Sequence, residues 1–123
     1  MVDSGKISAT SVGRAGEFLT ASKLQMAGLE TTHVAGSCDL HVALPNKRVL
    51  RVEVKAALTP SPSGSFRFHV GNSNAEVFML VSLQLSLIRI FNKSDLKKSM
   101  ITLRPAEFTE QAEADDIANL LMR

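Results

Sequence analysis

Two carboxylates and an ammonium group in the middle of the chain could act together, namely those of Asp39, Glu53 and Lys55. Side chains of these types take up and release protons, and where they converge they can also hold a charged ligand. The plain alternative is a surface ion cluster, which would contribute under about 1 kcal/mol to stability. Which of these applies depends first on whether the three side chains meet.

Two runs of alternating apolar and polar residues, 39–44 and 49–55, predict the β-strands that carry these groups. The sequence between them has the composition of a turn, so the strands are expected to form a hairpin. If the turn has three residues, Asp39 lies opposite Glu53, and Lys55 follows on the same face, about 7 Å along the strand. A two-residue turn would place Asp39 on the other face of the sheet.

Residues 8–28 predict a helix that precedes these strands. The run opens with Ser and Thr residues, which favour the start of a helix, and stops at Gly28, which favours the position after its end. Its expected buried face consists of the apolar residues at roughly helical spacing: Ala15, Phe18, Leu19 and Met26.

Glu17 lies beside the apolar face of this helix, because Ala21 and Leu24 follow it at i+4 and i+7. A carboxylate at a core-facing edge is costly unless a cation meets it, so Glu17 could join the other two carboxylates. Pairing with Arg14 or Lys23 on the same helix is the structural alternative.

The rest of the chain predicts an α/β fold. A Ser- and Pro-rich stretch, residues 59–65, is expected to be a flexible exposed loop. Further strands are expected at 31–34, 66–70, 77–83 and 87–91, and a closing helix at 107–122. The order of helix, strands and helix favours an α/β sandwich around a mixed sheet.

Three segments together resemble the PD-(D/E)XK nuclease superfamily: Gly13-Arg14-Ala15-Gly16-Glu17 in a helix, Asp39 opening a strand, and Glu53-Val54-Lys55 ending the next. The resemblance covers about residues 13–91 and is greatest to small Holliday-junction-resolvase-like and homing-endonuclease-like members. Cys38 stands where the superfamily's name has proline. A second acid-x-Lys triplet, Asp95-Leu96-Lys97, lacks this context.

The resemblance implies a restriction-endonuclease-like α/β/α sandwich with a central mixed β-sheet, formed by residues 1–123 as one nuclease domain. It also implies Mg²⁺, with Mn²⁺ as a possible substitute, held by Asp39, Glu53, the carbonyl of Val54 and Glu17. Lys55 would orient or deprotonate the attacking water and stabilise the charge on phosphate. Glu17, Asp39, Glu53 and Lys55 are therefore the expected catalytic residues.

DNA is the implied partner, and the charge distribution is compatible with it. Residues 107–123 carry five acidic residues and one basic residue, whereas residues 1–106 carry 13 basic and seven acidic residues. Contacts to DNA are expected from Arg14, Arg51, Arg67 and His69. Because two strands are normally cut by two active sites, a homodimer or higher homo-oligomer is expected.

Several function classes are not expected. The start of the chain lacks the apolar core of a secretory signal, and the longest apolar stretch is too short and too interrupted to span a membrane. A single cysteine favours a reducing cytoplasm, and the lack of paired Cys or His motifs argues against zinc. Two alternatives to a sequence-specific endonuclease stay open: a resolvase of Holliday junctions or other branched DNA, and a non-catalytic nucleic-acid-binding subunit.

Overall fold

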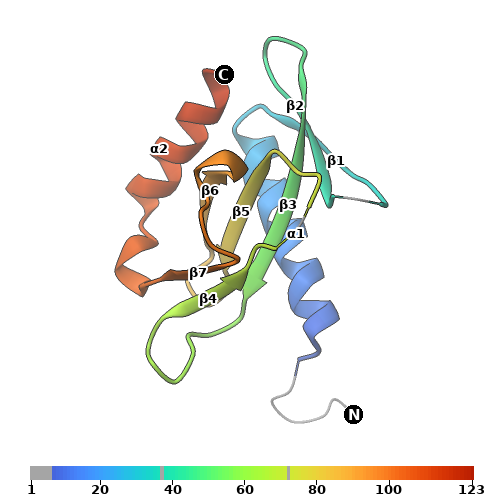
Figure 1. The fold of residues 1–123 in the computed structure, drawn as a ribbon. Helices are drawn as coiled ribbons and strands as arrows, with labels where there is room; N and C mark the ends of the chain where they lie inside the picture. Colours follow the sequence, from blue (N-terminus) through green and yellow to red (C-terminus); the bar gives the residue numbers. More distant parts are fainter. Residues whose placement is uncertain (1–6, 37, 72) are drawn as a thin grey trace.

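The structure is a computed structural model that describes residues 7–36, 38–71 and 73–123 (Figure 1). Its elements in chain order are α1 (Ala9–Met26), β1 (Glu30–His33), β2 (Leu40–Ala43), β3 (Val49–Ala57), β4 (Phe66–His69), β5 (Val77–Ser82), β6 (Leu87–Asn92), the 3-10 helix η1 (Lys93–Asp95), β7 (Met100–Leu103), the 3-10 helix η2 (Pro105–Glu107) and α2 (Glu110–Leu121). Every predicted helix and strand is present, with bounds shifted by at most three residues. β7 and the two 3-10 helices were not predicted.

The central sheet has five strands in the order β1-β2-β3-β5-β6. The strands β1, β2 and β3 form an antiparallel meander, β5 runs parallel to β3, and β6 is antiparallel to β5. A parallel pair needs a long crossover, and here the chain makes it through the segment that contains β4. The predicted mixed sheet is confirmed.

Helix α1 covers one face of this sheet (Figure 1), where Leu24 packs against alternate residues of β3 and β5 such as Val52 and Met79. Leu120 of α2 joins the same core. The other face of β5 carries Phe78 and is covered by a separate two-stranded sheet of β4 and β7. The α/β prediction with a central mixed sheet and flanking helices is confirmed, and the small β4–β7 sheet supplies the layer opposite α1.

The buried face of α1 differs from the predicted one. Its buried residues are Gly16, Thr20 and Leu24, whereas Phe18 is 63% exposed and Met26 is 87% exposed. Small residues face the sheet because the helix lies very close to it: a Cβ added to Gly16 would lie 2.5 Å from the Cβ of Ala56 in β3. Close approach, rather than apolar surface, selects the face that is buried.

Helix α2 covers the outer edge of the sheet at β6. Glu113 accepts a hydrogen bond from the Ile88 N–H at 2.8 Å, and Asp116 accepts one from the Ile90 N–H at 2.9 Å. Edge strands expose unpaired backbone groups that invite pairing with other chains, and these two carboxylates satisfy them. Among the described residues, no helix is long and apolar enough to cross a membrane.

Candidate active site

The β2–β3 hairpin has the predicted three-residue turn. The Leu44 N–H donates to the Arg48 carbonyl at 2.9 Å, and the ladder continues to the pair of Leu40 and Val52. The last turn residue, Lys47, has a φ of 70°, the left-handed conformation that commonly completes a three-residue hairpin loop. The predicted register is therefore confirmed, and it brings the start of β2 beside Glu53.

Asp39 lies where the pairing of β2 and β3 ends. Its N–H donates to the Val52 carbonyl at 2.9 Å, and its carboxylate Oδ2 accepts the Val54 N–H at 2.8 Å. The side chain thus takes the place of the next backbone partner along β3. Since the N–H and C=O of one strand residue point to the same side, the Val54 carbonyl also faces the Asp39 side of the strand.

Glu53 is held from two directions. Its Oε1 accepts a hydrogen bond from the Ser73 hydroxyl at 3.0 Å, and its Oε2 lies 3.4 Å from the Lys55 Nζ. The Glu53 side chain is 18% exposed and that of Lys55 is 39% exposed, so this ion pair opens to solvent on one side. Ser73 was missed by sequence reasoning, because nothing in an irregular loop indicates which strand it contacts.

Glu17, on α1, lies close enough to Asp39 and Glu53 for their charges to act on its carboxyl group. Burial raises the pKa of the Glu17 carboxyl above its usual value, and the negative charges of Asp39 and Glu53 raise it further. The positive charges of His33 and Arg14 oppose this shift of the pKa. Three carboxylates therefore share one neighbourhood, and the structure brings Glu17 to the site instead of pairing it with Lys23, which bonds Glu113.

The oxygen donors of this site are of the hard type that Mg²⁺ and Mn²⁺ prefer. Within residues 7–36, 38–71 and 73–123, however, no three His, Cys, Asp or Glu side chains lie close enough to enclose a metal alone. A cation here would therefore use a backbone carbonyl or water beside the carboxylates, and the Val54 carbonyl is correctly oriented for this. A cation would also relieve the mutual repulsion that raises the pKa of Glu17.

The four residues expected to contact DNA are placed differently from one another. Arg14 is close enough to Glu17 to influence its pKa, and Arg51 lies 3.6 Å from Glu76 in an ion pair. Arg67 and His69 are exposed on β4, since the phenylalanines that alternate with them fill the core. The structure thus gathers Glu17, Asp39, Glu53 and Lys55 with Arg14 nearby. It records no contact between Arg67 or His69 and these carboxylates in the described part of the chain.

Comparison with solved structures shows that the fold of this chain is similar to that of a known nuclease. A solved bacterial homing endonuclease superposes with a TM-score of 0.69 over 80% of this chain and 77% of that chain, at 18% sequence identity. The chain has a nuclease-like fold. No protein-family model matches the sequence, and no curated protein matches it. The likeness is therefore one of structure, as expected where a fold outlasts detectable sequence similarity.

Proposed function

We propose that this protein is a metal-dependent DNA endonuclease of the PD-(D/E)XK type. One observation carries the proposal. The Asp39 carboxylate accepts the N–H of Val54, the residue that lies between the paired Glu53 and Lys55 in β3. The fold that this chain shares with a bacterial homing endonuclease supports the proposal, because it makes the same class of reaction, cleavage of DNA, the first one to test.

The proposed metal ligands are Asp39, Glu53 and the carbonyl of Val54, with Glu17 completing the site directly or through a water molecule. Bound Mg²⁺, or Mn²⁺ in its place, would supply a Lewis acid for phosphate and acidify a water molecule. The chain's own contribution is to hold these oxygens in place: the Val54 N–H fixes Asp39 and the Ser73 hydroxyl fixes Glu53.

Lys55 is proposed to act on the water and the phosphate. Its ammonium group lies 3.4 Å from Glu53 and is partly open to solvent, so a phosphate that approaches the carboxylates also meets this cation. There the ammonium group can orient the attacking water and stabilise the negative charge that develops on the phosphate oxygens, whereas only the neutral amine form of Lys55 could take a proton from that water.

The proposed substrate is DNA, and the proposed assembly is a homodimer or higher oligomer. One chain carries one such site, so cutting both strands calls for a second copy. We also propose a cytoplasmic location, which the single unpaired cysteine of the sequence supports. Comparing several DNA substrates in the test distinguishes an enzyme that recognises a sequence from one that recognises branched DNA.

The test is cleavage of supercoiled plasmid, linear duplex, single-stranded DNA and a four-way junction in Mg²⁺, Mn²⁺ or EDTA. We expect cutting in either metal, none in EDTA, and a loss of at least about 100-fold in the Asp39→Asn variant. Asp95→Asn is the matched control, since Asp95 belongs to the other acid-x-Lys triplet, on η1. Cutting in EDTA, or equal activity of both variants, would contradict the proposal.

A further inference from the structure

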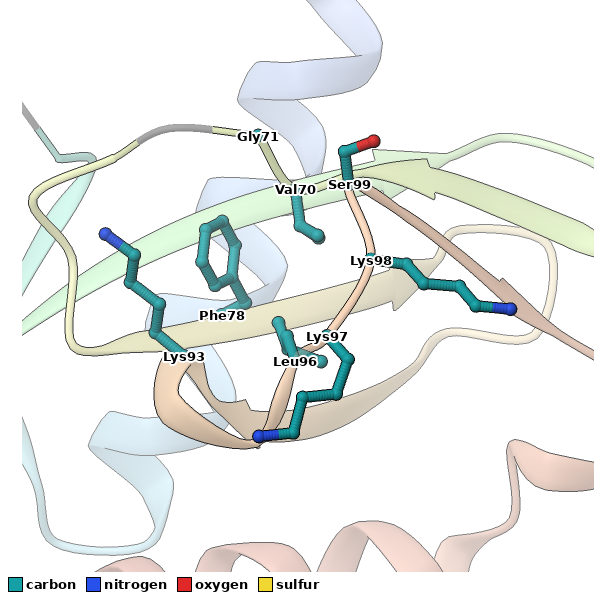
Figure 2. Close-up of a pocket in the computed structure, with 8 residues that line it drawn as sticks. All are labelled: Val70, Gly71, Phe78, Lys93, Leu96, Lys97, Lys98 and Ser99. Carbon is teal, nitrogen blue, oxygen red and sulfur yellow. The ribbon is translucent and has the colours of Figure 1, made fainter.

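A pocket of about 220 Å³ lies between the start of the β4–β5 loop and the segment that leads into β7 (Figure 2). Its apolar side chains are those of Val70, Phe78 and Leu96, and Phe78 is almost completely buried. The remaining residues that line it are Gly71, Lys93, Lys97, Lys98 and Ser99. We call this the lysine pocket.

The three lysines of the pocket have no acidic partner among the described residues. In the described part of the chain, ion pairs engage other basic residues such as Lys23, Arg48 and Arg89, but none involves Lys93, Lys97 or Lys98. All three are exposed. Figure 2 shows their ammonium groups spread around the apolar side chains rather than meeting at one point. A rim of separated cations suits a chain of phosphates better than a single small anion.

The lysine pocket is connected to the candidate active site through one residue. The Lys93 ammonium group donates a hydrogen bond to the Ser73 carbonyl, and the Ser73 hydroxyl donates to Glu53 at 3.0 Å. Val70 and Gly71, which line the pocket, begin the loop that leads to Ser73. A ligand on the lysine rim would therefore lie one loop away from the carboxylates.

We infer that the lysine pocket binds backbone phosphates of a DNA strand, and that a neighbouring phosphate of the same strand lies at Asp39 and Glu53. The inference rests on the proposed function, since it takes DNA as the ligand. Phosphates follow one another every 3.4 Å of helix axis along a strand, so a strand at the carboxylates presents further phosphates nearby. The pocket would then fix the strand's position and direction without reading its bases.

The test measures the affinity of a fluorescently labelled duplex and a four-way junction by anisotropy in EDTA, which keeps binding separate from cutting. The variants are Lys97→Gln, Lys98→Gln and the double variant, with Lys47→Gln as the control because Lys47 is an exposed lysine in the β2–β3 turn. Each lysine that contacts a phosphate contributes roughly eightfold to duplex affinity at 0.1 M salt, and its loss lowers the salt slope by about 0.9.

We expect each single pocket variant to weaken DNA binding about eightfold and the double variant to weaken it by the product of the two factors. Lys47→Gln should change the affinity little. Thermal melting of each variant reports whether the fold is kept. Equal losses in all three single variants, or none in the pocket variants, would overturn the inference. So would competition by inorganic phosphate beyond its effect on ionic strength, because that would make the pocket a single-anion site.

These outcomes are separable from those of the proposed function. Metal-dependent cutting with unchanged binding by the pocket variants would overturn the inference alone. Binding that depends on Lys97 and Lys98 without any cutting would overturn the enzyme proposal and leave the pocket as a DNA contact.

Discussion

Replacing Gly16 by alanine should destabilise the protein, although glycine inside a helix is usually the worse residue. A Cβ at this position would lie 2.5 Å from the Cβ of Ala56. Two carbon atoms pack at roughly 3.5–4.0 Å, so α1 must move away from β3 by about 1.0–1.5 Å. That movement loosens the core around Leu24 and carries Glu17 away from Asp39 and Glu53.

The magnitude follows from two opposing effects. Glycine to alanine in a helix gains about 0.5–1 kcal/mol, whereas forcing an extra carbon into a packed interface costs about 1–3 kcal/mol. The clash here is with the Cβ of a strand residue rather than a flexible side-chain end, so we take the upper part of that range. The net loss should be about 1–2 kcal/mol, which for 123 residues is a fall in Tm of roughly 4–8 °C.

Gly13 provides the control on the same helix. Among the described residues, no atom beyond the neighbouring backbone of the helix itself lies within 4 Å of a Cβ built there, so Gly13→Ala should gain about 0.5–1 kcal/mol. Thermal unfolding followed by circular dichroism at 222 nm measures both variants. The Ala56→Gly change in the Gly16→Ala background should recover part of the loss, because it removes the atom in the way. If Gly16→Ala were as stabilising as Gly13→Ala, the close approach of α1 to β3 would be refuted.

Three further substitutions have expected outcomes. Glu17→Gln should stabilise the metal-free protein at neutral pH, because a carboxyl whose folded-state pKa is raised destabilises the fold once ionised. The gain should shrink as pH falls through that raised pKa towards the usual value of about 4.5, and urea unfolding at several pH values checks it. The Thr20 hydroxyl is buried with no hydrogen-bond partner among the described residues, so Thr20→Val should stabilise the protein by about 1 kcal/mol. A fall in Tm on thermal melting would contradict this and show that the hydroxyl has a partner. Asp116→Ala should cost about 2–3 kcal/mol, since it strips partners from the β6 edge and from a guanidinium group. In the part of the chain that the structure describes, the side chain of the exposed neighbour Asp115 bonds Gln111 alone. Asp115→Ala should therefore cost under about 0.5 kcal/mol, and equal losses in the two variants would contradict the edge-capping role of α2.

The hairpin was predictable from sequence because its information is local. Alternation fixes which face of each strand is buried, and the composition of residues 45–47 favours a turn whose length sets the register. With a three-residue turn these place Asp39 beside Glu53, and the structure has that turn and that register. Even so, alternation could not show that the Asp39 carboxylate would accept the Val54 N–H and so extend the bonding to β3 beyond its backbone contact with Val52.

The remaining features depend on packing between distant segments. The face of α1 was predicted only in part: Leu19 packs against the core, but the interface selects the small residues Gly16 and Thr20 and leaves the larger Phe18 and Met26 exposed. The pairing of β4 with β7 joins two four-residue strands, and sequences this short do not indicate which strand they pair with. The bond from Ser73 to Glu53 likewise comes from a loop whose path is set by the whole fold.

The most direct test of the central claim is the rate of plasmid cleavage by Lys55→Met at saturating Mg²⁺, with metal affinity measured separately. This change removes the ammonium group that lies 3.4 Å from Glu53 and keeps the carboxylates. If Lys55 acts on the water and the phosphate, cleavage should fall by about 100- to 10,000-fold while metal still binds. A rate within a few-fold of the unaltered protein would contradict the assignment of this site.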